Sequence, residues 1–145
     1  MVHKHKGEDK GEILREKGFR LTVGRLKLLS LLEHSGKPLS IQTILSTWKG
    51  KPPDTATLYR SLTDLSTAGI VRRVDLNTGV AHFEYTPDRP HHHHVVCTGC
   101  GSIEEIEECS VDSLEKKILR ESTQFTKINT HNLEFFGECN KCVQV

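Results

Sequence analysis

The chain has 145 residues, of which 20 are Lys or Arg and 19 are Asp or Glu, giving a formal net charge of +1. This length allows one domain or two small ones, and neither half alone could bury a large core. No stretch approaches the roughly 18 consecutive apolar residues of a membrane span, and the N-terminus is polar, so we expect a soluble, cytoplasmic protein without a membrane partner.

The small net charge conceals an asymmetry between the two halves. Residues 1–90 contain 15 Lys or Arg and 10 Asp or Glu, a net charge of +5, whereas residues 91–145 contain 5 and 9, a net charge of −4. A basic half suits a polyanion such as DNA, and an acidic half rich in His and Cys suits a cation.

Capping residues and glycines divide the first 70 residues into four expected helices. Residues 8–18 predict a short polar helix that ends at Gly18, and Thr22 is a suitable N-cap for the second helix. Ser40 can cap the third helix, and Asp54 or Thr55 can cap the fourth. The expected buried positions of the last three helices are Leu28, Leu29 and Leu32, then Ile41, Ile44, Leu45 and Trp48, then Leu58, Leu62 and Leu65.

A β-hairpin is expected next, with strands at residues 70–74 and 80–86 around an Asn-Thr-Gly turn. Helices followed by a hairpin are the order of a winged helix, whose last helix enters the DNA major groove. On that helix Arg60 can reach a guanine edge or a phosphate, and Tyr59 a thymine methyl. The expected DNA-binding residues, each of which could also be an ordinary solvated side chain, are Arg20, Arg25, Thr57, Tyr59, Arg60, Arg72 and Arg73.

A Pro-containing hinge at residues 87–91 separates an expected DNA-binding domain (1–86) from a C-terminal domain (92–145). In the C-terminal domain we expect strands at residues 93–97 and 102–106 and a long strand at residues 125–136. Ser110 is the expected N-cap of a helix that carries Val111, Leu114 and Ile118. With so few elements, this domain is expected to gain core by forming a homodimer.

Two Cys-x-x-Cys pairs, Cys97 with Cys100 and Cys139 with Cys142, predict a structural zinc bound by four thiolates. Two disulfides or free buried cysteines are the alternatives, and a reducing compartment disfavours disulfides. The four histidines before Cys97 lie inside the chain, unlike an engineered tag. The expected fold class is therefore α+β: an N-terminal winged-helix DNA-binding domain plus a small C-terminal α/β dimerisation domain with structural zinc.

Five motifs occur in order along the chain: Gly18-Phe-Arg-Leu-Thr-Val-Gly-Arg25, Ala56-Thr-Leu-Tyr-Arg-Ser-Leu62, Phe83-Glu84, His91-His-His-His-Val-Val-Cys-Thr-Gly-Cys-Gly101 and Thr130-His-Asn-Leu133. Through these motifs the chain resembles, from Ile13 to Cys142, the ferric-uptake regulator family of bacterial metal-sensing repressors. The resemblance implies a homodimer whose winged helices bind an A/T-rich palindromic operator. The terminal Cys-Asn-Lys-Cys-Val-Gln-Val and Pro38-Leu39-Ser40 are similar to zinc-uptake regulators.

An extended strand alternates its side chains, so the histidine run is expected to present His92 and His94 on one face and His91 and His93 on the other. The resemblance implies a regulatory site at Glu84, His92, His94 and Glu105, which suits Zn²⁺ or Fe²⁺, with Mn²⁺ or Ni²⁺ also possible. The family often has a further histidine where this chain has Lys37-Pro38; His34 or His82 could substitute, and His82 shares a strand face with Glu84.

The other face of the run predicts a second metal site at His91, His93, Asp112 and His131. Asp112 could instead serve only the first turn of its helix, where a carboxylate is favourable, and His131 could be a core residue. Cys109, the odd cysteine, is expected to have a buried structural role.

The leading hypothesis is a metal-dependent transcriptional repressor, not an enzyme, in which metal at the regulatory site locks the hinge and sets the spacing of the two winged helices. A peroxide sensor of the same family, a zinc-ribbon scaffold and a zinc hydrolase that uses Glu84 or Glu105 as its base are the alternatives. Four thiolates leave no open zinc position, which disfavours the hydrolase.

Overall fold

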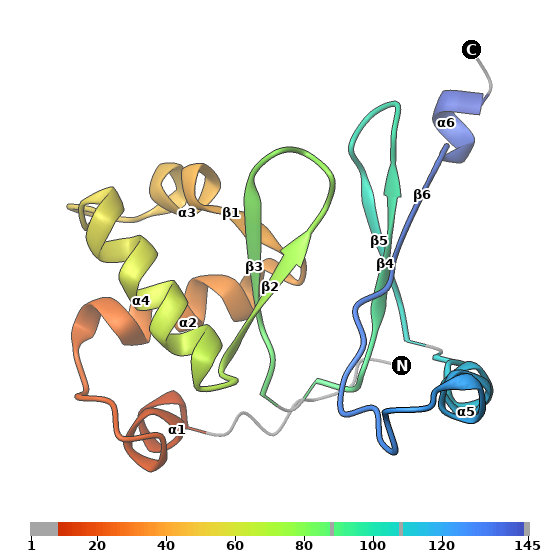
Figure 1. The fold of residues 1–145 in the computed structure, drawn as a ribbon. Helices are drawn as coiled ribbons and strands as arrows, with labels where there is room; N and C mark the ends of the chain where they lie inside the picture. The colour runs from red at the N-terminus through yellow and green to blue at the C-terminus, as the bar shows by residue number, and fades with distance from the viewer. Residues whose placement is uncertain (1–8, 88, 108, 144–145) are drawn as a thin grey trace. The chain divides into compact units, whose positions relative to one another are not determined.

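The structure, a computed structural model, describes residues 9–87, 89–107 and 109–143 (Figure 1). It divides into two compact units, Met1–Arg89 and Pro90–Val145, called unit 1 and unit 2 below. Residue 8 of the expected first helix and residue 88 of the expected hinge lie outside the described residues. Among the described residues, no helix has the length and hydropathy that a membrane crossing requires.

Unit 1 begins with four helices whose N-caps are short polar side chains. Asp9 caps α1 (Lys10–Glu16), and Thr22 caps α2 (Val23–Ser35) by accepting a hydrogen bond from the Arg25 amide. Ser40 caps α3 (Ile41–Thr47), and Asp54 caps α4 (Thr55–Thr67). These caps satisfy backbone N–H groups that have no partner within the first helical turn. The Thr22 and Ser40 caps are confirmed, and Asp54, not Thr55, caps the fourth helix.

Unit 1 also contains a three-stranded antiparallel sheet in the order β1–β3–β2 (Figure 1). The expected hairpin forms from β2 (Val71–Asp75) and β3 (Ala81–Tyr85), with Asn77 and Gly79 of its turn at positive φ. The short strand β1 (Leu39–Ser40) was not expected from the sequence; it pairs with β3 just before α3 begins.

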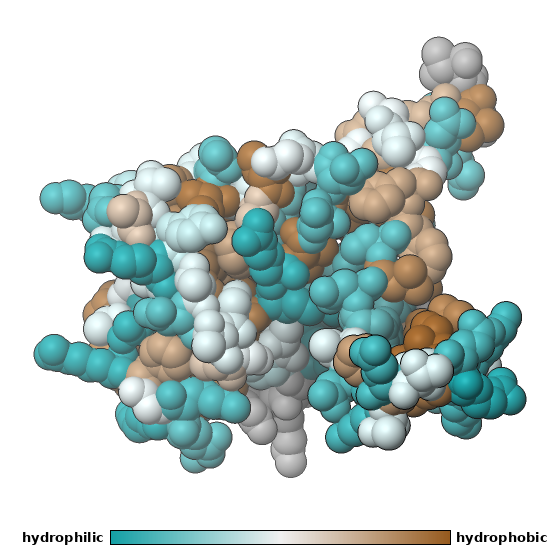
Figure 2. All heavy atoms as spheres, viewed as in Figure 1, coloured by the Kyte–Doolittle hydropathy of each residue, from teal (hydrophilic) through white to brown (hydrophobic). Residues whose placement is uncertain are grey.

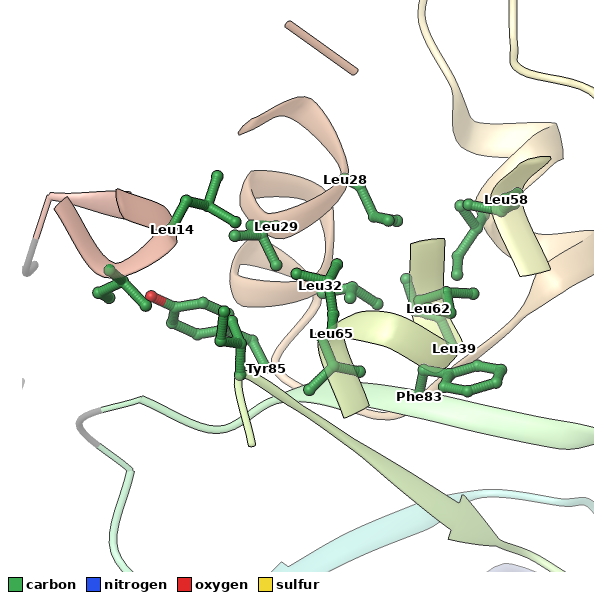
Figure 3. Packing of buried hydrophobic residues seen from close by; sticks show 14 residues of the cluster. Leu14, Leu28, Leu29, Leu32, Leu39, Leu58, Leu62, Leu65, Phe83 and Tyr85 are labelled. Atoms are coloured by element: carbon green, nitrogen blue, oxygen red, sulfur yellow. The ribbon is translucent and has the colours of Figure 1, made fainter. Parts of the chain in front are cut away.

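The core of unit 1 lies between the helices and one face of this sheet. Figure 3 shows leucines of α1, α2 and α4 converging on Phe83 and Tyr85 of β3. The leucines expected to be buried in α2 and α4 all are, whereas in α3 only Ile44 is buried and its expected partners lie at the edge of the core: Ile41, Leu45 and Trp48. Since alternate residues of β3 face the core, Glu84 and His82 lie on the opposite face of the sheet.

Unit 2 contains a mixed three-stranded sheet in the order β5–β4–β6. The central strand β4 (His93–Cys97) pairs antiparallel with β5 (Ile103–Ile106) and parallel with β6 (Glu134–Gly137). The helix α5 (Asp112–Glu121) lies between β5 and β6 in the sequence, and the short α6 (Asn140–Val143) ends the described chain.

Two expectations for unit 2 were wrong. The long strand expected at residues 125–136 is limited to β6, because the chain before Glu134 is irregular. Ser110 does not cap α5; Val111 occupies that position and its side chain makes no capping hydrogen bond. The first turn of α5 instead carries Asp112 and Glu115, whose negative charges stabilise a helix N-terminus.

Unit 2 buries very little apolar surface. Among its described residues only Val96 and Cys97 are buried apolar side chains, while three consecutive imidazoles are buried: His92, His93 and His94. Figure 2 shows hydrophobic surface in the region of α5 and β6. The large apolar side chains that remain exposed on and around these elements are Leu114, Ile118, Phe125, Phe135 and Phe136. Unit 2 by itself therefore lacks the apolar core that usually stabilises a domain.

The packing of α4 predicts how a substitution in its buried face changes the stability of unit 1. Leu62 is fully buried, so Leu62→Ala is expected to lower the free energy of unfolding of this unit by about 2–5 kcal/mol. Trp48 is the single tryptophan and belongs to unit 1, so its fluorescence during urea unfolding reports this unit. The neighbouring Thr63 is exposed, and Thr63→Ala should change the stability by no more than about 0.5 kcal/mol. Equal effects of the two substitutions would contradict the assigned core face of α4.

Candidate metal centres and nucleic-acid interface

The four-sulfur cluster of unit 2 is assembled by the parallel pairing of β6 with β4. This register places Cys97 opposite Gly137, two residues before Cys139, and the Thr98 amide donates to the Gly137 carbonyl at 2.7 Å. The sulfurs of Cys97, Cys100, Cys139 and Cys142 then lie within 4.8 Å of one another, and all five cysteines of the chain are free.

The spacing of these sulfurs fits zinc. The Cys100 and Cys139 sulfurs are 3.7 Å apart, and sulfurs about 2.3 Å from a tetrahedral zinc would be about 3.8 Å apart. The Cys139 amide donates to the Cys97 sulfur at 3.3 Å. Amide hydrogen bonds of this kind, from Cys100 first and then Cys139, lower the pKa of Cys97 to about 6, which favours its thiolate.

The fourth sulfur shows why a cation is needed. Contacts with the other three cysteines, of which Cys97 has the largest effect, raise the pKa of Cys142 to about 12. Four thiolates therefore cannot coexist here without a positive charge. A dication that binds all four removes this penalty and displaces the remaining thiol protons. The cluster therefore suits a structural zinc, as expected from the sequence.

The histidine run alternates as expected. The His92 and His94 rings lie together with their centroids 5.1 Å apart, whereas His91 and His93 lie together at 4.7 Å. His91 also contacts His131, with 2.9 Å between the two Nε2 atoms. The strand period thus separates the four imidazoles into two pairs.

The pair formed by His92 and His94 lies beside acidic side chains of the unit 2 sheet. His92 Nδ1 is 2.9 Å from the Pro90 carbonyl and 3.7 Å from Glu105 Oε1, and His94 is paired in register with Glu105. Glu134, which the sequence did not single out, accepts from the His94 amide at 2.9 Å and lies 3.0 Å from His94 Nδ1. Such carboxylate contacts orient an imidazole and fix which nitrogen is available to a metal.

In unit 1, the other residues expected in the regulatory site have partners of their own. Glu84 is buried, and its Oε1 accepts from Arg72 Nε at 2.6 Å. Burial lowers the pKa of His82, which favours the neutral imidazole, and its Nδ1 lies 3.1 Å from the Val80 carbonyl. His34 is exposed on α2 and lies 2.6 Å from the Ser30 carbonyl.

Three of the four residues expected in the second metal site lie together in the structure. The cluster contains His91, His93 and His131, but its fourth member is Cys109 and not Asp112. Cys109 is half-buried, so the expectation that it would be buried was wrong. Sequence spacing could not reveal this position, although an odd cysteine in a histidine-rich domain is itself a signal.

The expected DNA-binding residues lie on three parts of unit 1: α2 with the residues just before it, α4, and β2. Thr57, Tyr59 and Arg60 face outward on α4, while Leu58 between them is buried. Arg25 and Thr57 both line a cavity of about 240 Å³ between α2 and α4.

The guanidinium groups of unit 1 have different surroundings. Arg25 lies over the Phe19 ring at 5.3 Å and donates to the Arg20 carbonyl at 2.9 Å. Arg73 is exposed on β2, whereas Arg72 is held by Glu84 and is the least available of the expected set.

Three comparisons with known proteins agree. Residues 16–136 match the Ferric uptake regulator family. The chain is 34% identical over 132 residues to a ferric uptake regulation protein of Neisseria meningitidis, covering 89% of this chain and 90% of that protein.

Two solved structures are also similar. The ferric uptake regulator of Vibrio cholerae matches with a TM-score of 0.74 and 28% identity, over 90% of this chain and 100% of that one. The ferric uptake regulator of Francisella tularensis with iron matches with a TM-score of 0.72 and 29% identity, over 87% and 96%. These likenesses confirm the expected α+β fold class.

The first Cys-x-x-Cys turn gives a test of the four-sulfur cluster. A Cβ at Gly99 would lie 2.9 Å from the Cys142 sulfur and 3.2 Å from its Cβ. Gly99→Ala should therefore displace Cys142, lower stability by about 1–3 kcal/mol, and release zinc to a chelator faster. Zinc content and thermal unfolding measure both effects.

Two further variants serve as the neutral control and the ligand-removal control for that test. Gly137→Ala places its Cβ in open space and should behave as the unchanged chain. Cys97→Ser should lose about one zinc per chain, because it removes a ligand outright. Equal zinc retention in the Gly99, Gly137 and Cys97 variants would refute the four-sulfur zinc site.

Proposed function

The chain belongs to the ferric uptake regulator family of metal-responsive transcriptional regulators, and on that premise we propose that it represses metal-homeostasis genes. Members of this family bind operator DNA as dimers. The proposed operator is an A/T-rich palindrome, whose two half-sites match a two-fold symmetric dimer. The proposed role is regulatory and not enzymatic, and it assigns the protein to the cytoplasm, where chromosomal DNA lies.

One observation supports the sensing role above all. His92 and His94 are buried at 3% and 1% exposure beside carboxylates of their own sheet, in a unit with almost no apolar core. Burying imidazoles is costly unless they are paired or bind a metal. We infer that His92, His94 and Glu105 belong to the regulatory site, together with Glu84 and His82 as expected from the sequence.

The metal at this site would be a divalent cation that accepts nitrogen and oxygen ligands: Zn²⁺, Fe²⁺, Mn²⁺ or Ni²⁺. A cation at Glu84 has to compete with Arg72 for the same carboxylate oxygen. This competition raises the cation concentration needed for binding, and thereby helps to set the threshold of the sensor.

The proposed interface with DNA is the outward side of α4. Tyr59 is 47% exposed although it lies between buried positions, and Arg60 follows it in the basic half of the chain. An exposed aromatic ring beside a guanidinium is suited to a thymine methyl and a guanine edge or phosphate. Arg25, Thr57 and Arg73 are proposed to hold the flanking backbone, with Arg20 beside them.

A metal-titrated mobility shift on A/T-rich palindromic DNA tests this function as a whole. A sensor binds DNA only above a threshold of one metal, whereas a zinc scaffold shows no such dependence. Loss of binding after peroxide treatment with iron, but not with zinc, would identify the peroxide-sensing alternative instead.

The regulatory site predicts a specific loss. His92→Ala or His94→Ala removes an imidazole from the proposed ligand set, so half-maximal DNA binding should require at least about tenfold more metal. The measurement is the same mobility shift over a series of buffered metal concentrations. His34→Ala is the matched control, since His34 is exposed on α2 and should leave the threshold unchanged. A shifted threshold in the His34 variant alone would reverse the assignment.

The α4 surface predicts a different pattern. Tyr59→Ala and Arg60→Ala should each weaken operator binding by about 1–3 kcal/mol per lost base contact. Dimerisation and zinc content should not change, because both residues are exposed and belong to unit 1. Lys116→Ala, an exposed cation of α5, serves as the control for a general loss of positive charge. Full operator affinity in both α4 variants would show that another element reads the DNA.

A further inference from the structure

One carboxylate of β6 holds His94 at two points. Glu134 Oε2 accepts from the His94 backbone amide at 2.9 Å and lies 3.0 Å from His94 Nδ1. The His94 ring is 1% exposed and the Glu134 side chain 16% exposed, so little water competes for these contacts. Because both contacts use the same oxygen, the backbone and the ring of His94 are fixed relative to one side chain of the neighbouring strand.

The same contacts determine which ring nitrogen can bind a metal. A carboxylate oxygen only accepts, so the neutral ring of His94 donates from Nδ1 and keeps its lone pair on Nε2. His92 has the same arrangement, because its Nδ1 lies 2.9 Å from the Pro90 carbonyl, which also only accepts. The two rings thus offer the same nitrogen to an ion, and the negative charge behind His94 makes its Nε2 the more basic metal ligand.

The strand that carries Glu134 also leads to the four-sulfur cluster. One parallel ladder joins β4 and β6, with His94 opposite Glu134 at one end and Cys97 opposite Gly137 at the other. Two residues further along, the Cys139 amide donates to the Cys97 sulfur at 3.3 Å. The strand β6 is four residues long, so its two ends are about 10 Å apart. A single short strand therefore connects the partner of His94 with two of the four cluster sulfurs.

The register of this ladder decides whether Glu134 reaches His94. Side chains alternate along a strand, so a shift of β6 by one residue along β4 would turn Glu134 to the other face of the sheet. Such a shift would place Leu133 or Phe135 opposite His94, and neither side chain can accept a hydrogen bond. The chain before Glu134 is irregular and does not fix this register. What holds the far end of β6 therefore also holds Glu134 in place.

We propose that Glu134 is a positioning residue of the regulatory site, and that through it the affinity of this site depends on zinc at the four-sulfur cluster. Zinc bound by Cys139 and Cys142 fixes the end of β6, β6 fixes Glu134, and Glu134 fixes His94 with Nε2 available to the regulatory ion. The inference rests on the proposed function, because it takes His94 as a ligand of that ion. Each of the two centres then strengthens metal binding at the other, since coupling between binding sites is reciprocal.

The test follows the ring nitrogens of His94 by nitrogen-15 NMR in the full chain, with zinc retained at the four-sulfur cluster. Comparison with the spectrum of His94→Ala identifies the His94 signals. Before the regulatory ion is added, these signals should show a neutral ring with its proton on Nδ1. Buffered Zn²⁺ should then shift the Nε2 signal, and the concentration that gives half of the shift measures the affinity of this site alone.

Three variants separate positioning from charge and from a structural effect. Glu134→Ala removes both contacts, so the ring proton should move towards Nε2 and the affinity for Zn²⁺ should fall by about 10–100-fold. Glu134→Gln keeps an oxygen that accepts but removes the negative charge, so the proton should stay on Nδ1 and the loss of affinity should be smaller. Glu104→Ala is the matched control, because Glu104 is an exposed carboxylate on β5 of the same sheet. A purely structural role of Glu134 would lower stability and leave the position of the ring proton unchanged.

Gly99→Ala tests the dependence on the four-sulfur cluster, since its Cβ displaces Cys142 without removing a ligand. Introduced alone, it should weaken Zn²⁺ binding at His94 by about fivefold or more. Introduced together with Glu134→Ala, it should weaken this binding much less, because the connection through Glu134 is already broken. Gly137→Ala is the control for the Gly99 substitution, since its Cβ would lie in open space.

Three outcomes would overturn the proposal, and they can be told apart. If Glu134→Ala leaves both the ring proton and the affinity unchanged, Glu134 does not position His94. If Gly99→Ala has no effect, or the same effect with and without Glu134, the cluster is not coupled to the regulatory site through this residue. If Zn²⁺ does not shift the His94 signals even in the unsubstituted chain, His94 is not a ligand, and the proposed regulatory site itself is wrong.

Discussion

Unit 2 depends on burying imidazoles and sulfurs where a small domain ordinarily buries aliphatic side chains. Among its described residues, the buried ones are His92, His93, His94, Val96 and Cys97, all on or beside the central strand β4. Buried polar groups destabilise a fold unless each has a partner, and two apolar side chains cannot compensate for three imidazoles. A bound metal would add to the stability of this unit, because ligands that do not converge in the unfolded chain bind the ion only after folding.

The geometry of β4 allows one short segment to serve several centres. Successive side chains of a strand point to opposite faces, so His92 and His94 separate from His91 and His93. The end of the same strand supplies Cys97 to the four-sulfur cluster, and the parallel partner β6 supplies Glu134 to His94. A shift of register by one residue would exchange the two histidine pairs and separate Cys97 from Cys139. The four-sulfur cluster, by fixing the ends of β4 and β6, also stabilises the register on which the histidine sites depend.

In unit 1 the buried and the outward side chains have separate roles. Leucines at helical spacing form its core, and the residues between them on α4 remain outward and available to DNA. The reverse face of its sheet is different, because buried Glu84 accepts from Arg72 there and needs that charge as long as no cation replaces it. In the sequence Arg72 looks like a free cation on the hairpin, but in the structure it is bound to a carboxylate. The neighbouring Arg73 is exposed instead.

Local chemistry in the sequence was sufficient for most of the fold. Thr22, Ser40 and the glycines that follow the helices define helix ends through contacts that span only a few residues. The two Cys-x-x-Cys turns identify a zinc site in the same local way, because each turn brings two sulfurs together within four consecutive residues. The strand period also sufficed to separate the histidines. Only the tertiary structure decided the features that depend on distant segments: that β6 is short and pairs parallel with β4, that Glu84 is paired with Arg72, and that Cys109, not Asp112, meets His131. Those contacts join residues brought together by packing, and no local periodicity in the chain encodes which of two neighbouring side chains, three residues apart, will face a distant ring.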